Sequence, residues 1–146
     1  MLFDVLLLAA TAVAQNTDRA FLGSWTLNVA KSDLGERAKP KMGHVNWGEH
    51  GWTLAIVGAN GELYAEAVST DGDCTLIGVF PKQSCEIEIV TSQHVRFTIK
   101  EGMTIRRVSD IQLLGNATTQ MIHRVIPTGR APYVQKTIWE RSRLPR

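Results

Sequence analysis

Tryptophan, tyrosine and histidine residues are the side chains of this 146-residue sequence that best suit the binding of a small molecule. Trp47 and Trp52 flank a short turn, where they would either line the entrance to a cavity or pack half-buried. Trp139 shares one face of a strand-like run with Tyr133, and this face would line either a cavity or the outer wall. His123 would orient a ligand if it faces an apolar interior. The predicted ligand-lining side chains are Trp47, Trp52, Phe97, His123, Tyr133 and Trp139.

Patterns that would carry other chemistry are weak in this sequence. His44 and His50 lie near Glu49, but their spacing matches no common metal site, and two cysteines alone cannot complete a tetrahedral zinc site. The sequence has neither a nucleophile elbow nor a phosphate-binding glycine loop. The formal net charge of +2 is too small to indicate a nucleic-acid partner. We therefore predict no catalytic residue, no metal site, no cofactor and no nucleic-acid partner.

The N-terminal segment has the composition of an export signal. The apolar run from Val5 to Ala14 is too short to span a bilayer, which needs about 20 residues, and it ends in the small-x-small pattern that signal peptidase cleaves. Asp4 precedes this run where a basic residue is usual, so a buried first strand is the alternative interpretation. We predict a signal peptide over residues 1–14 and one domain over 15–146, in a secreted or periplasmic protein.

Export would allow the two cysteines to form a disulfide bond. Gly78 and Pro81 lie between Cys74 and Cys85 and would let the chain double back. A catalytic thiol and two buried free thiols are the alternatives, but no neighbouring His or Lys would activate a thiolate. We predict a structural Cys74–Cys85 disulfide.

Apolar and polar residues alternate along most of the remaining chain, as in strands with one buried and one solvated face. For example, Leu63, Ala65 and Ala67 alternate with the run of Tyr64, Glu66 and Val68. Turn sequences such as Asn60-Gly61 separate the strand-like runs. Strands are expected at 22–28, 43–49, 52–58, 62–69, 74–80, 85–91, 94–100, 103–109, 111–126 and 132–140, the ninth possibly broken, with a loop or one helical turn over 33–41.

No crossover helix is expected, so the fold class is all-β and antiparallel. An up-and-down meander of about eight to ten strands closes into a barrel without exposed edges. Such a barrel leaves an interior that is either filled by side chains or able to hold one small ligand.

The first expected strand resembles that of lipocalin-like proteins. The motif from Phe21 to Ser32 (FLGSWTLNVAKS) contains the Gly-x-Trp pair Gly23 and Trp25, and it is similar to exported bacterial lipocalin-like proteins of unassigned function. The resemblance implies a calycin-type barrel closed near Trp25, with a cavity for a small apolar ligand. It also implies that a basic residue packs on Trp25, for which Arg141 is the first candidate and Arg124 the second.

These features together predict an exported lipocalin-like barrel that binds a small hydrophobic or amphipathic molecule in its interior. One alternative is a structural or interaction protein of the cell envelope with a filled barrel. The other is an enzyme that uses an inward His or carboxylate as its base. No membrane span is expected, and the protein is expected to be a monomer or a homodimer.

Overall fold

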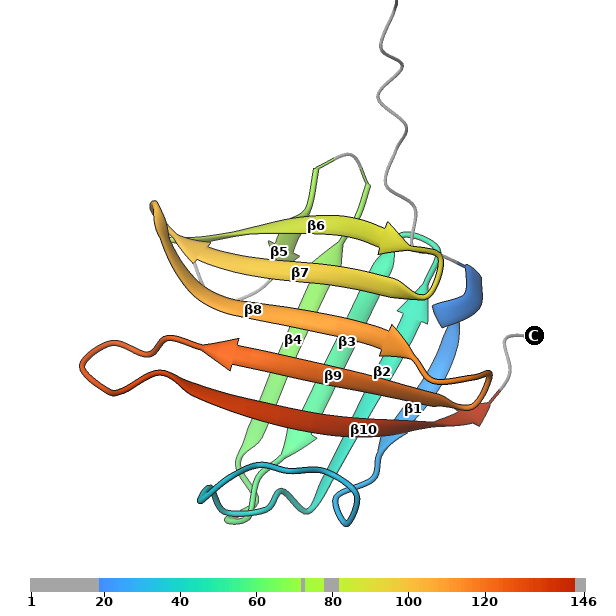
Figure 1. Cartoon of the computed structure of the whole chain (residues 1–146), viewed down its shortest axis with the longest axis horizontal. Coiled ribbons are helices and arrows are strands. Elements are labelled where there is room, and N and C mark those ends of the chain that lie inside the picture. Colours follow the sequence, from blue (N-terminus) through green and yellow to red (C-terminus); the bar gives the residue numbers. More distant parts are fainter. Residues whose placement is uncertain (1–18, 72, 78–81, 144–146) are drawn as a thin grey trace, which may run out of the picture.

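The structure, a computed structural model, describes residues 19–71, 73–77 and 82–143. The predicted signal peptide over residues 1–14 lies outside the described residues. Ten antiparallel strands form one sheet that curls into a nearly closed barrel, so the predicted all-β barrel is confirmed (Figure 1). The elements are η1 (Arg19–Phe21, a 3-10 helix), β1 (Gly23–Leu27), β2 (Met42–Gly48), β3 (Gly51–Val57), β4 (Leu63–Ser69), β5 (Thr75–Ile77), β6 (Gln83–Thr91), β7 (His94–Glu101), β8 (Thr104–Leu113), β9 (Thr118–Val125) and β10 (Tyr133–Arg143).

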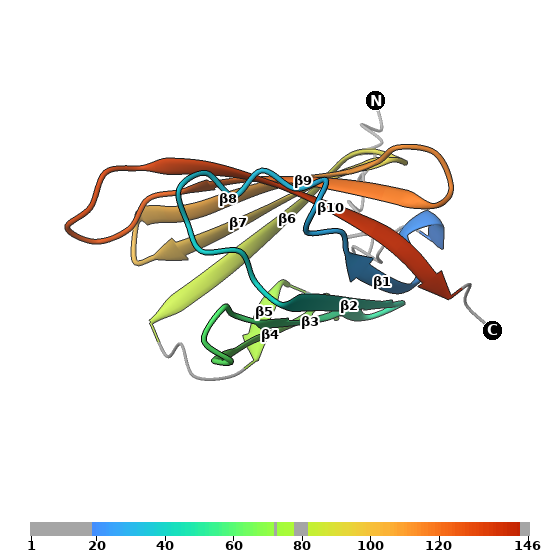
Figure 2. The ribbon, with the colours of Figure 1, turned by 90° about the horizontal axis from the view of Figure 1, so that it is seen from below.

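The strands follow an up-and-down order around the barrel. Except for β5 and β6, strands that follow one another in the chain pair with each other, and the pairing of β1 with β10 joins the first and last strands. Within the described residues β5 and β6 do not pair, so a seam remains between these two edges. Figure 2 shows the result as two layers, β1–β5 and β6–β10, that face each other across the interior.

The run over 111–126, predicted as a strand that is possibly broken, is divided in the structure. β8 ends at Leu113 and β9 begins at Thr118, and the turn between them contains Gly115 at a φ of 84°. Glycine adopts this left-handed conformation without the steric cost that other residues meet, which allows a tight turn at this point. Residues 33–41 form a loop, as expected, and Asp33 pairs with Lys136 of β10 through two backbone hydrogen bonds of 2.8 Å.

Aromatic side chains fill one end of the barrel. Trp47 lies between Phe21 and Trp52, with ring centroids 5.4 and 4.5 Å away, and Trp52 packs edge-on against Phe97 at 4.9 Å. All four rings are buried. Aromatic contacts of this kind stabilise a fold by about 0.5–1.5 kcal/mol each beyond the apolar area they bury. This end of the barrel is therefore a packed plug and not an entrance.

Trp25 and Arg141 hold the first and last strands together next to this plug. They are direct partners in the β1–β10 register, and the Arg141 guanidinium lies 4.2 Å from the centroid of the Trp25 ring. Arg141 also donates to the backbone carbonyls of Leu22, Ala20 and Asn116, while Trp25 Nε1 donates to the carbonyl of Phe21. The structure therefore places Arg141 and not Arg124 on Trp25.

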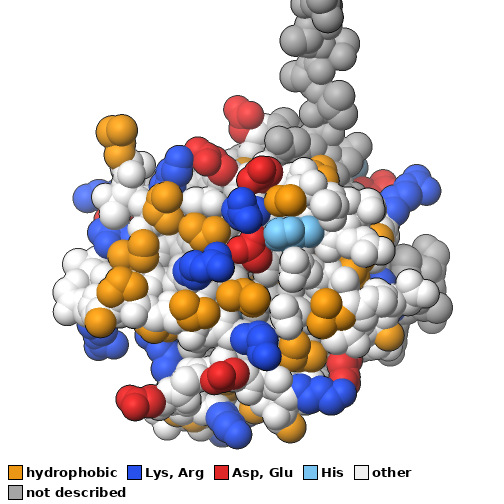
Figure 3. All heavy atoms as spheres, in the orientation of Figure 1, with side chains coloured by type: hydrophobic (Ala, Val, Ile, Leu, Met, Phe, Trp, Pro, Cys, Tyr) orange, Lys and Arg blue, Asp and Glu red, His pale blue; other side chains and the backbone are white. Residues whose placement is uncertain are grey.

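Arg124 instead belongs to a charged cluster on the outer wall. Asp110 accepts hydrogen bonds from Arg96 and Arg124 and lies 2.8 Å from His94 Nε2. Burial opposes ionisation of this carboxyl group, but the three basic partners hold the pKa of Asp110 below its usual value. Figure 3 shows charged side chains interspersed with hydrophobic ones on this outer face, as expected for a solvated wall.

The face of β4 that turns into the barrel carries a carboxylate. Leu63 is 69% exposed, whereas Glu66 and Val68 face the interior. The cause is the register with β3, in which Leu54 pairs with Glu66 and Trp52 pairs with Val68. Paired residues of antiparallel strands project to the same side, so the inward side chains of β3 bring Glu66 inward with them.

The predicted Cys74–Cys85 disulfide is confirmed, with the two Cα atoms 5.5 Å apart. Cys74 directly precedes β5, and Cys85 lies within β6. The bond therefore crosses the seam between the two edge strands, where no backbone ladder joins the described residues.

Candidate functional site

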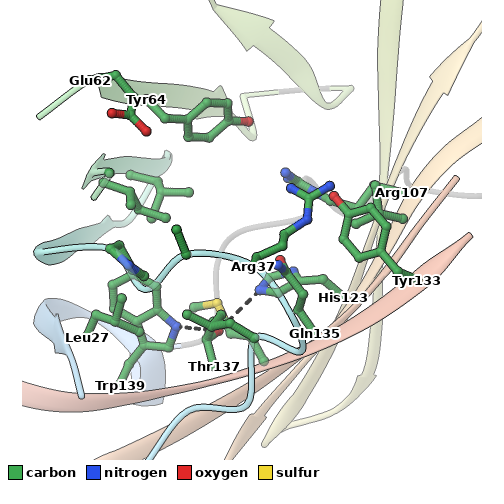
Figure 4. A pocket seen from close by; sticks show the side chains of 18 residues that line it. Leu27, Arg37, Glu62, Tyr64, Arg107, His123, Tyr133, Gln135, Thr137 and Trp139 are labelled. Carbon is green, nitrogen blue, oxygen red and sulfur yellow. Dashed lines mark hydrogen bonds between the residues drawn. The ribbon is translucent and has the colours of Figure 1, made fainter. Parts of the chain in front are cut away.

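A cavity of about 470 Å³ occupies the end of the barrel opposite the aromatic plug. This volume lies within the roughly 300–1,000 Å³ typical of small-molecule pockets. Much of its wall is apolar and is formed by inward side chains of β1, β3, β9 and β10. The apolar wall residues are Leu27, Leu54, Ile56, Met121, Val125 and Trp139 (Figure 4).

The loop of residues 28–41 covers the mouth of this cavity. Seen from below, it crosses the end of the barrel between the two layers of strands (Figure 2). Leu34, Arg37, Ala38 and Pro40 of the loop line the cavity. The loop is held to β10 by the Asp33–Lys136 bridge, so its position over the mouth is fixed at one end.

A buried ion pair lies between the cavity and the plug. Arg107 Nη2 of β8 donates to both carboxylate oxygens of Glu66, at 2.8 and 2.9 Å, and the Tyr64 hydroxyl donates to the same carboxylate at 2.9 Å. The side chains of Glu66 and Arg107 are 4% and 19% exposed. Burial disfavours the charged guanidinium, but Glu66 raises the pKa of Arg107 above its ordinary value. The two charges therefore neutralise each other inside the barrel.

His123 faces inward from β9 and joins a network of hydroxyl groups. Its Nδ1 lies 2.8 Å from Ser109 Oγ, and its Nε2 lies 3.2 Å from Thr137 Oγ1. Trp139 Nε1 donates to Thr137 Oγ1 at 2.9 Å, which orients the indole on the cavity wall (Figure 4). Burial and then the positive charge of Arg107 lower the pKa of His123 to about 3. The imidazole is therefore neutral near pH 7, and both of its nitrogens are engaged.

Polar side chains surround the mouth of the cavity. The Arg37 guanidinium lies 3.9 Å from the centroid of the Tyr133 ring, where a cation–π contact holds it. Gln135 follows Tyr133 on the same inward face of β10. Glu62 lines the opposite side, on the turn between β3 and β4 (Figure 4).

The six predicted ligand-lining residues fall into two groups. His123, Tyr133 and Trp139 line the 470 Å³ cavity. Trp47, Trp52 and Phe97 instead belong to the plug and line a separate void of about 30 Å³, about the volume of one water molecule. Of the two alternatives for Trp47 and Trp52, an entrance or packing, the structure has packing, because their hairpin lies at the filled end of the barrel.

Three charged residues of the interior and the mouth were not predicted from the sequence: Glu66, Arg107 and Arg37. Glu66 and Arg107 each lie in an alternating run, but alternation alone does not tell which face of a mixed run turns inward. Pairing β4 with β3 in register would have placed Glu66 beside Leu54 and indicated an inward carboxylate. Arg37 lies on a loop, and no periodic signal predicts where a loop side chain reaches.

The inward ionisable groups are poorly suited to acid–base chemistry. A base with a pKa of about 3 takes up a proton poorly near neutral pH, which makes His123 a weak candidate for a general base. Glu66 is bound on both oxygens, and Ser109 is buried without direct exposure to the larger cavity. Among the described residues, no group of three or more His, Cys, Asp or Glu side chains could hold a metal ion.

The comparisons with known proteins return no match: no family model fits the sequence, and no curated protein or solved structure matches the chain. The lipocalin-like resemblance of Phe21–Ser32 therefore stays a prediction. Within the described part of the chain, no helix is both long enough and apolar enough to cross a bilayer.

Proposed function

We propose that this protein is an exported, lipocalin-like carrier that binds a small apolar or amphipathic molecule inside its barrel. The observation that carries the proposal is the cavity of about 470 Å³ with a mainly apolar wall, next to an interior end that is already well packed. A purely structural barrel has no need for such a space, because apolar wall left in contact with water forgoes the roughly 25 cal/mol per Å² that its burial would contribute. A ligand would recover that loss.

Export is part of the same proposal. The disulfide of Cys74 and Cys85 supports a secreted or periplasmic location, because such bonds persist mainly in oxidising compartments. The apolar run from Val5 to Ala14 supports it from the sequence side. Fractionation of the native host, followed by N-terminal sequencing of the mature chain, tests this part independently of ligand binding.

Ligand binding is tested by titrating the protein with retinol, decanoic acid and haem. Trp139 lies on the cavity wall, so we expect at least one of these probes to change the tryptophan fluorescence and to appear bound in native mass spectrometry. If none of them binds, the proposed function is wrong.

A matched pair of substitutions on one hairpin locates the bound probe. Val125→Phe would fill the cavity from β9, and Val134→Phe would add the same volume to the outer wall, where Val134 is 60% exposed. We expect the inward substitution to weaken binding at least tenfold and the outward one to leave it unchanged. Equal effects of the two substitutions would place the probe outside the cavity and contradict the proposal.

A further inference from the structure

Three charged side chains line the cavity, Arg37, Glu62 and Arg107, and a fourth, Glu66, lies beside it against Arg107. All but Arg37 already have a charged or hydrogen-bonding partner. Arg107 and Glu66 form the buried ion pair. Glu62 folds back over its own turn, where it accepts a hydrogen bond from the Asn60 N–H and packs on Gly58, at the position that a Cβ atom would occupy. Among the described residues, no carboxylate forms an ion pair with Arg37.

The deep end of the cavity is unfavourable for an anion. A second carboxylate placed beside Arg107 would also lie near the charge of Glu66, and like charges at close range disfavour each other. His123 is neutral there and has both nitrogens engaged. One buried donor, Arg107 Nε, has no hydrogen-bond partner among the described residues, so this region offers a single point for an uncharged acceptor such as a hydroxyl or carbonyl oxygen.

The mouth of the cavity, in contrast to its deep end, has hydrogen-bond donors that are available to an anion. The guanidinium of Arg37 lies over the Tyr133 ring, and none of its N–H groups donates a hydrogen bond to another described residue, so they are available for an acceptor. The Tyr133 hydroxyl and the Gln135 amide line the same side of the cavity, and no described residue hydrogen-bonds to either side chain. The loop of residues 28–41 carries Lys31, Arg37, Lys39 and Lys41 against Asp33 and Glu36, so its net charge is positive.

We propose that the ligand is an amphipathic anion, with its carboxylate at the mouth against Arg37, Tyr133 and Gln135 and its apolar chain directed into the barrel. This inference rests on the proposed function. It names both the chemical class of the ligand and its orientation, with the charge at the loop and the tail toward Met121 and Trp139.

Three probes with the same ten-carbon chain test the charge: decanoate, 1-decanol and decyltrimethylammonium, each below its micelle concentration. Isothermal titration calorimetry should show decanoate binding about tenfold more tightly than decanol, and the cationic probe binding most weakly. Raising the salt concentration from about 0.05 to 0.5 M should weaken decanoate binding and leave decanol unchanged, because exposed charges are screened.

Two arginine substitutions locate the anion. Arg37→Gln should remove the preference for decanoate while leaving decanol affinity within about twofold. Arg130→Gln, the same change at an exposed position that does not line the cavity, should alter neither. Arg107→Lys keeps a cation opposite Glu66 and should retain the preference.

The outcomes separate the two proposals. If none of the three probes binds, the proposed function fails for this ligand class and the inference fails with it. If the probes bind with equal affinity, or if Arg37→Gln keeps the preference for decanoate, the inference is overturned and cavity binding stands.

Discussion

Removing the disulfide by the double substitution Cys74→Ala and Cys85→Ala should lower the free energy of unfolding by about 3 kcal/mol. The bond closes a loop with a sequence separation of 11 residues, and the chain-entropy relation for a loop of that length gives about 3 kcal/mol at 25 °C. For a chain of this size, such a loss corresponds to a fall in melting temperature of roughly 10 °C.

Urea denaturation of the wild-type and double-variant proteins, each with and without a phosphine reductant, measures this effect. The wild-type protein in reductant should unfold at the urea concentration that unfolds the variant. The variant itself should not respond to the reductant, which controls for other effects of the reagent. A difference below about 1 kcal/mol would refute the loop-closure argument.

Amide hydrogen exchange tests where the bond acts. Since the disulfide crosses the seam between β5 and β6, its loss should speed exchange in these two strands more than in β9 and β10, which have paired neighbours on both sides. A uniform increase over all strands would show that the bond acts through global unfolding alone, with no additional effect at the seam.

Three further predictions concern the interior and the closed end. Arg107→Met should cost about 3–5 kcal/mol in urea denaturation because the Glu66 carboxylate would stay buried with no cation opposite it, and adding Glu66→Gln should recover most of that loss. Arg141→Lys should cost about 2 kcal/mol, since lysine cannot stack on the indole and reach three carbonyls; an unchanged melting temperature would contradict this role. The pKa of His123 is about 3 in the folded protein and 6.5 in a free side chain, so the unfolded chain binds the proton more readily. The unfolding free energy should therefore fall by a few kcal/mol as the pH drops from about 6.5 to 3, and His123→Asn, but not the exposed control His50→Asn, should flatten that slope.

Local sequence signals predicted most of the barrel. Alternating runs marked the strands because their side chains project to opposite faces with a period of two. The turn sequences separated them, and the break in the run over 111–126 falls at the Gly115–Asn116 turn sequence. Cys74 and Cys85 lie close in the chain, so their pairing was also accessible from sequence.

The candidate site was predicted only in part. Tyr133 and Trp139 share a face in any extended strand, and the structure turns that face toward the cavity. The sequence left open whether Trp47 and Trp52 line an entrance or pack, and the structure places their hairpin in the plug. Which end of a barrel is filled depends on the side chains that meet there from distant strands.

Strand formation, most of the turns and the pairing of Cys74 with Cys85 follow from residues that are near one another in the chain. The inward ion pair of Glu66 and Arg107, and the place of Arg37 over the mouth of the cavity, do not. The facing of a mixed strand and the unfilled volume depend on register and closure between β-strands far apart in the chain.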